Sequence, residues 1–162
     1  NLPQITLAQI NGAAVGAGLC LALACDLRTT LSDPKLAFNF VRLGLNPGMA
    51  AWPLARATLG EARARELLLT GRFFTGSNLH AWGAAALAAD TPKELEERTC
   101  SLALEISSKS WPALRTLKAE MRIGESLEKY LALEAQGQAL CFKGSDIVEG
   151  LSALREKRPP RF

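Results

Sequence analysis

The sequence predicts an α/β fold that continues into a helical region. Short strand-like stretches surround one apolar helix in the first part of the chain, whereas helix start signals and helical periodicity dominate the second part. The 162 residues, 48% hydrophobic and 22% charged, are enough for one globular core. We therefore expect a mixed region over residues 1–90 and a helical region over residues 91–162.

The mixed region begins with a predicted strand at Ile5–Ile10, where apolar and small polar residues alternate before the turn pair Asn11-Gly12. A glycine-rich turn then opens into a helix over residues 17–27, which is apolar nearly throughout and is predicted to be buried on all sides. Further expected elements are strands at 27–31 and 36–38, a surface helix at 60–70 closed by Gly71, and a short helix starting at Thr75 or Ser77.

The helical region opens with a strong start signal. Thr91 is expected to cap a helix, Pro92 suits the first helical position, and Glu94 completes a capping box. One face of this helix carries Leu95, Thr99, Leu102 and Ile106. Three more helices are expected over residues 110–121, over residues 126–141, and from Ser145 to a point before Pro159-Pro160.

The totals exclude several classes of protein. A net charge of +3, with no basic run interleaved with aromatic residues, argues against a nucleic-acid partner. The longest apolar stretch, residues 19–25, is too short to span a membrane, and no signal-peptide pattern is visible. The four cysteines form no Cys-x-x-Cys pair and His80 is the only histidine, so no metal site is expected. We expect a cytoplasmic protein with reduced cysteines.

The turn NGAAVGAGLC offers a specific chemistry. A glycine turn feeding a helix presents backbone N–H groups and the positive end of the helix dipole, which suit an anion or a developing negative charge. Its spacing, Gly12-x-x-x-Gly16-x-Gly18, matches neither the dinucleotide-binding nor the P-loop pattern. The alternative is that the small residues only let a helix pack close to a sheet.

Four blocks of sequence resemble the crotonase superfamily, also called the enoyl-CoA hydratase/isomerase family. They are PQITLAQINGAAVGAGLCLALACDLR, FVRLGLNPGM, LLLTGRFFTG and EGLSALREKRPPRF. The resemblance implies that residues 1–90 are the C-terminal part of a spiral core built from ββα turns. It also implies that residues 91–162 are a helical region through which the protein forms trimers or hexamers. Family members carry about a hundred residues ahead of this point, a length within one ordinary domain, so we expect the chain to be a fragment.

The resemblance also implies a substrate and a site. Family substrates are thioesters of coenzyme A or of a carrier protein's phosphopantetheine, which belong to the substrate, so no separate cofactor is expected. The backbone N–H of Ala17 is expected to be one of two donors to the thioester oxygen, with the second donor in the preceding half. The remaining substrate-binding residues are expected to be Gly16, Gly18, Phe40, Leu43 and Met49.

Two departures from the family pattern bear on the reaction. Hydratases of the family use two glutamates as acid and base, and these positions are occupied here by Cys20 and Phe40. Family isomerases keep the second glutamate, which Phe40 also removes. We therefore do not expect conventional hydration, and we expect decarboxylase-like or other lyase or isomerase chemistry instead. The Thr116-Leu117-Lys118 stretch is similar to the decarboxylating branch.

Several alternatives stay open at this point. Cys20 is either a small buried hydrophobe or a thiol facing the acyl group, for which His80 is the only distant partner. Asp26 is interpreted as a cap or a structural ion pair. Asn39 and Asn46 are either turn residues or hydrogen-bond partners of the substrate, and the basic tail over residues 155–161 is either solvated or near CoA phosphates. The whole protein is either an enzyme or a non-catalytic acyl-CoA-binding or structural subunit.

Overall fold

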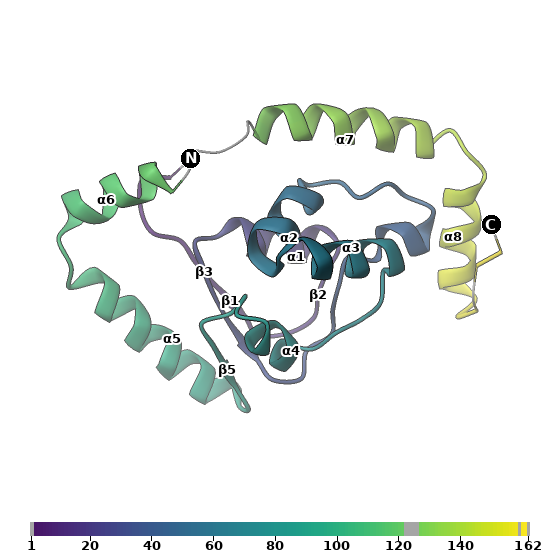
Figure 1. The fold of residues 1–162 in the computed structure, drawn as a ribbon. Coiled ribbons are helices and arrows are strands. Elements are labelled where there is room, and N and C mark those ends of the chain that lie inside the picture. The colour runs from purple at the N-terminus through teal and green to yellow at the C-terminus, as the bar shows by residue number, and fades with distance from the viewer. Residues whose placement is uncertain (1, 122–126, 159, 162) are drawn as a thin grey trace.

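The computed structural model describes residues 2–121, 127–158 and 160–161. A mixed region is followed by helices, as the sequence predicts (Figure 1). In chain order the elements are β1 (Leu7–Ile10), β2 (Ala14–Val15), α1 (Ala17–Ala24), β3 (Leu27–Leu31), β4 (Leu36–Ala37), the 3-10 helix η1 (Asn39–Leu43), α2 (Ala51–Leu59), α3 (Glu61–Thr70), α4 (Gly76–Ala81), β5 (Leu87–Ala89), α5 (Pro92–Ser107), α6 (Trp111–Glu120), α7 (Leu127–Cys141) and α8 (Asp146–Arg155).

Two small parallel sheets form the framework. One has the strand order β1-β3-β5, with Leu7 opposite Leu27 and Thr29 opposite Leu87. The other pairs β2 with β4. Parallel neighbours need a crossover connection. Helix α1 supplies it, because it connects β1 and β2, which precede it in the chain, to β3 and β4, which follow it. Strands β1 and β2 are followed by α1, and strands β3 and β4 are followed by η1 and α2, so the chain repeats a ββα unit.

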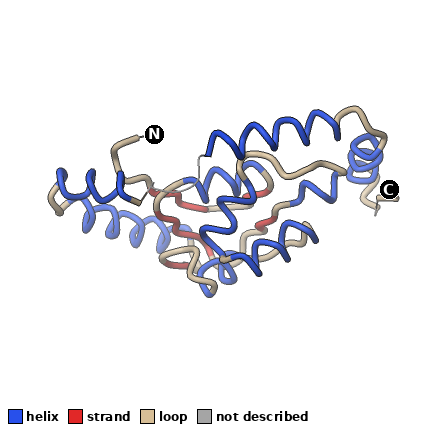
Figure 2. The backbone as a smooth tube through the Cα atoms, turned by 45° about the horizontal axis from the view of Figure 1, so that its top comes forward, coloured by secondary structure: helices blue, strands red, loops and turns tan. Residues whose placement is uncertain are grey.

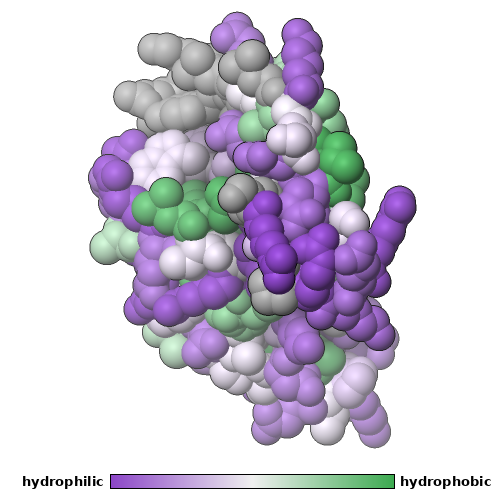
Figure 3. Space-filling model, turned by 90° about the vertical axis from the view of Figure 1, so that its right-hand side faces the viewer, coloured by the Kyte–Doolittle hydropathy of each residue, from purple (hydrophilic) through white to green (hydrophobic). Residues whose placement is uncertain are grey.

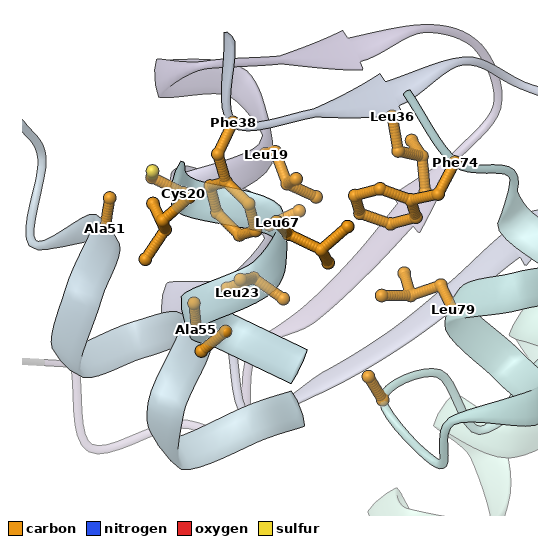
Figure 4. Close-up of a cluster of buried hydrophobic side chains, with 14 of the residues drawn as sticks. Leu19, Cys20, Leu23, Leu36, Phe38, Ala51, Ala55, Leu67, Phe74 and Leu79 are labelled. Carbon is orange, nitrogen blue, oxygen red and sulfur yellow. The ribbon is translucent and has the colours of Figure 1, made fainter. Parts of the chain in front are cut away.

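The main core lies where α1, α2 and α3 meet β4 (Figure 4). Leu19 of α1, Leu36 of β4 and Leu67 of α3 are completely buried. Burial of a leucine side chain contributes about 1.5–3 kcal/mol, so this cluster is a large part of what fixes α1 against the sheet. The core thereby determines the direction in which the N-terminal end of α1 points.

Helix α1 differs from its prediction in two ways. It ends at Ala24, because Cys25 adopts an extended conformation with φ −72° and ψ 156°. It is also not buried on all sides: Ala17, Gly18 and Ala24 are exposed, and Leu21 is 66% exposed. No described segment of the chain covers that side of the helix, so its apolar residues face outward.

Four elements, β2, η1, α2 and β5, have no counterpart in the sequence prediction. Helix α2 follows Met49 and Ala50, which both have positive φ values, of 58° and 55°. This left-handed backbone at two residues other than glycine gives no helix signal in the sequence. Strand β5 has only three residues, and its pairing with β3 decides its conformation. Strand β2, likewise, has only two residues and is defined by its pairing with β4. Local patterns do not show such tertiary contacts.

The four C-terminal helices follow the predicted order. Thr91 caps α5 by accepting a hydrogen bond from the Glu94 amide at 3.2 Å, but the Glu94 carboxylate accepts from the Asp90 amide, so the capping box is incomplete. Helix α5 packs on β1, β3 and β5, whereas α6, α7 and α8 lie around the edge of the core (Figures 1 and 2). The side that carries α8 is largely hydrophilic with separate apolar patches (Figure 3). No described helix is both long enough and apolar enough to cross a membrane.

Candidate active site

The glycine turn has a geometry that only glycine tolerates. Gly16 is the N-cap of α1, with φ 57° and ψ −118°, and its N–H donates to the Ala37 carbonyl at 2.8 Å. A Cβ atom at Gly16 would lie 3.2 Å from Asn39 Oδ1. A positive φ and this close approach together explain the glycine. The turn is thus held between β4 and η1.

The first amides of α1 lie at the surface. The Cys20 amide bonds back to the Gly16 carbonyl at 3.1 Å, and the amides before it have no partner within the helix. Ala17 and Gly18, which carry two of these amides, are both exposed. The N-terminal end of the helix dipole adds positive potential at the same place. The turn can therefore hold an oxygen that carries negative charge.

Phe40 forms an apolar wall beside this turn. It is 8% exposed, and its ring atom Cζ lies 3.7 Å from where a Gly16 Cβ would be. The structure therefore places Phe40 beside Gly16 and Ala17, three residues for which the family resemblance implies a role in one site. Leu43 lies on the other side of η1, where its backbone is in close contact with Gly150 of α8. Met49 is 54% exposed.

Cys20 points into the protein. It is 1% exposed, and its Sγ donates to the Gly48 carbonyl at 3.9 Å. Figure 4 shows the Cys20 sulfur on the side of α1 that faces Ala51 of α2. His80 is exposed on α4, and its Nδ1 lies 2.9 Å from the Ala85 carbonyl oxygen. These contacts favour the interpretation of Cys20 as a small packed hydrophobe that ties α1 to the loop before α2.

An open hollow lies on the exposed side of α1. Its volume is about 690 Å³, and apolar side chains and backbone of β1, β2 and α1 line most of it. Gly18 borders it, so the hollow reaches the first turn of the helix. The sequence prediction did not include this surface, although an all-apolar helix is the signal that could have indicated it. The lining residues are Ala8 to Val15, Gly18, Leu21, Ala22 and Cys25.

The other end of α1 is fixed by charged groups. Asp26 forms an ion pair with Lys118 at 2.6 Å, which confirms its interpretation as a structural partner. Burial alone would raise the pKa of Asp26, but the hydrogen bonds from Lys118 and Thr6 outweigh it and hold the pKa below its usual value. Arg28 donates to the Cys25 carbonyl at 2.7 Å and to the Ala84 carbonyl at 2.6 Å. This guanidinium caps the C-terminal end of α1.

Metal-binding geometry is not found in the part of the chain that the structure describes. Within it, no three histidine, cysteine, aspartate or glutamate residues lie close enough to hold an ion. Among the described residues, Cys20, Cys25, Cys100 and Cys141 form no disulfide.

Comparison with known proteins places these features in a family. The model of the enoyl-CoA hydratase/isomerase family matches residues 1–162. A putative enoyl-CoA hydratase of Thermus thermophilus is 37% identical over 162 residues, covering 99% of this chain and 63% of that protein. The mitochondrial methylglutaconyl-CoA hydratase of Rattus norvegicus is 33% identical, covering 100% of this chain and 53% of that enzyme.

The fold is shared with a solved structure as well. The crystal structure of an enoyl-CoA hydratase from Mycobacterium avium subsp. paratuberculosis superposes with a TM-score of 0.93 at 28% identity, covering 99% of this chain and 66% of that one. The expected crotonase-like α/β fold is therefore confirmed. This chain spans between about half and two thirds of the length of these three proteins.

Proposed function

Because the chain belongs to the enoyl-CoA hydratase/isomerase family, we propose that its glycine turn holds the carbonyl oxygen of an acyl thioester while that oxygen becomes enolate-like. The observation that carries the proposal is the exposed N-terminal end of α1, where the amides of Ala17 and Gly18 have no partner within the helix. A donor already in place stabilises the developing charge without reorganisation. The thioester is that of coenzyme A or of a carrier protein.

The residues beside the turn favour a reaction that begins without a general base. Cys20 is buried and its thiol donates a hydrogen bond to the Gly48 carbonyl. The side chain of Phe40 is apolar and has no group that can transfer a proton. Neither can replace a glutamate that activates water, so we propose that the protein does not hydrate enoyl thioesters.

Decarboxylation suits these parts. In that step the bond between the α-carbon and a carboxylate breaks, and CO2 leaves. The electron pair enters the enolate, whose oxygen accepts from the Ala17 amide, and the α-carbon then takes a proton from water. The apolar side chain of Phe40 would disfavour the charged carboxylate in the ground state.

A second candidate is a non-catalytic subunit that binds an acyl thioester. The observation in its favour is that Cys20 and Phe40 occupy the two positions at which family hydratases carry glutamates. The site therefore lacks the acid–base pair of those enzymes. Binding without turnover is the result that would identify it.

One substitution tests the role of the turn. Ala17→Pro removes the proposed donor at the first helical position, where proline is well tolerated. We expect butyryl-CoA to raise the melting temperature of the unsubstituted chain and of the control Ala17→Ser, which keeps the N–H, but not that of a folded Ala17→Pro. Equal stabilisation of all three would contradict the proposal.

The reaction is tested separately. We expect no hydration of crotonyl-CoA above background under conditions in which a known enoyl-CoA hydratase consumes it. Release of CO2 from a malonyl-type thioester would support decarboxylation, whereas butyryl-CoA binding with neither reaction would favour the non-catalytic subunit. Rapid hydration of crotonyl-CoA would overturn the argument from Cys20 and Phe40.

A further inference from the structure

Helix α6 has an unusual pattern of burial. Of the side chains that the structure describes on this helix, residues 111–118, only that of Lys118 is buried, with the residue 4% exposed. The apolar residues Trp111 and Leu117 are 44% and 47% exposed. A helix that packs by the hydrophobic effect has its apolar residues inside, so α6 is held in a different way.

Lys118 joins α6 to two other segments. Its Nζ lies 2.6 Å from Asp26 Oδ2 and donates to the Gln4 carbonyl at 2.5 Å. The same Asp26 oxygen accepts from the Thr6 amide at 2.6 Å and from the Thr6 hydroxyl at 2.7 Å. The start of the chain, the residue after the α1 C-cap, and α6 therefore meet at one carboxylate. Figure 1 shows α6 beside the N-terminal end of the chain.

The pair is well compensated for a buried charge. Asp26 Oδ2 has three donors, and the ammonium group of Lys118 has a carboxylate and a carbonyl as acceptors. An ion pair with this many hydrogen bonds offsets the loss of hydration. Removal of Asp26 would leave the buried Lys118 ammonium with the Gln4 carbonyl, whereas removal of Lys118 would leave a partly exposed carboxylate that still accepts from Thr6. The intact pair is therefore stable, whereas loss of either residue leaves the other without its main partner.

We propose that Lys118 is a latch: its ion pair with Asp26 fastens α6 to the C-terminal end of α1, and α6 separates from the core when the pair is removed. Trp111 and Leu114 of α6 line an open, largely apolar groove together with Ile5, Leu7 and Ile106. This role concerns the fold and does not depend on the proposed reaction.

Hydrogen exchange of the 162-residue chain, measured by mass spectrometry, tests the latch. We expect Lys118→Met to speed exchange of the α6 amides at least tenfold and to leave those of β3 unchanged. Arg115→Met is the matched control, because Arg115 is an exposed residue of the same helix and its loss changes the net charge equally. We expect it to leave α6 protection as in the unsubstituted chain.

If Lys118→Met does not fold, a second variant allows the same measurement. The double substitution Asp26→Asn with Lys118→Met leaves neither charge buried alone, and we expect it to fold with fast exchange confined to α6. The proposal is overturned if α6 in the folded variants exchanges as slowly as in the unsubstituted chain, or if Arg115→Met speeds exchange equally. It is also overturned if α6 is already unprotected in the unsubstituted chain.

Discussion

Cys20 occupies a position at which family hydratases carry a catalytic glutamate, but its surroundings do not suit acid–base chemistry. The resemblance places it where family hydratases carry a glutamate, and the structure buries it with 1% exposure. Its Sγ–Gly48 contact links α1 to the loop before α2. At Ala17 the reverse holds, because the proposed role needs only the backbone N–H and not the side chain.

Thiol reactivity separates the two interpretations of Cys20. We expect iodoacetamide to modify Cys100 quickly in the folded protein, because Cys100 is exposed, and to leave Cys20 unmodified. Peptide mass spectrometry after a short incubation measures both sites in one sample. If Cys20 reacted as fast as Cys100, it would have to be an accessible thiol and a candidate for acid–base or nucleophilic chemistry.

At the scale of elements, η1 is the link between the site and the C-terminal helices. One side of η1 places Asn39 and Phe40 against Gly16, and the other side meets α8. A Cβ atom at Gly150 of α8 would lie 2.6 Å from the carbonyl carbon and oxygen of Leu43. Helix α8 therefore sets the position of η1, and η1 shapes the wall of the proposed site.

Substitution of Gly150 tests this packing. We expect Gly150→Ala to lower the free energy of unfolding by about 1–3 kcal/mol, the usual cost of overpacking, because both contacting atoms are backbone atoms. Gly12→Ala is the control, since a Cβ there meets no atom within 4 Å. Denaturant melts of the two variants measure the difference, and equal stabilities would show that α8 does not press on η1.

A pH-dependent ion pair joins the first turn of α8 to the segment that follows the helix. Glu149 accepts two hydrogen bonds from Arg158, at 2.6 and 3.0 Å, and one from the Arg161 amide at 2.7 Å. The hydrogen bonds from the Arg158 side chain, followed by that from the Arg161 backbone, lower the pKa of Glu149 from 4.5 to about 2. A carboxylate with a depressed pKa contributes stability that is complete above its unfolded-state pKa and is lost as the pH falls through the folded value.

The stability difference between the unsubstituted chain and Glu149→Gln should therefore be constant above pH 4.5. We expect it to shrink as the pH falls from 4.5 to about 2, because the unfolded chain takes up a proton at Glu149 near pH 4.5, whereas the folded chain does so only near pH 2. Thermal melts of both proteins across this range measure it. A stability difference that stayed constant down to pH 2 would show that the stabilisation does not come from the ionised Glu149 carboxylate.

Local signals predicted most elements but not the surfaces between them. Thr91 and Pro92 indicated the start of α5, and Gly71 indicated the end of α3, because capping depends on neighbouring residues only. Helix α2, the 3-10 helix η1 and the short strands β2 and β5 are not predicted, because their conformations depend on tertiary contacts. The contact of Phe40 with Gly16 followed from a resemblance rather than from any local pattern, and the hollow beside α1 required the three-dimensional structure.

At the scale of the whole molecule, apolar side chains on α8 and on the turn before it are exposed. Phe142 is 65% exposed, Val148 67% and Leu154 62%. We propose that copies of the chain cover them by forming trimers or hexamers, as the family resemblance implies. Sedimentation should show a trimer or larger assembly that Val148→Gln weakens. A monomer at all concentrations would contradict this assembly.

The central claim is that the first amides of α1 hold the thioester oxygen. The most direct test is the amide NMR resonance of Ala17, followed while butyryl-CoA is added to the labelled chain. We predict that the Ala17 resonance moves downfield to saturation, as expected for an N–H that gains a hydrogen bond, and that the buried core amide of Leu67 does not move. An Ala17 resonance that stayed in place while butyryl-CoA bound elsewhere would contradict the claim.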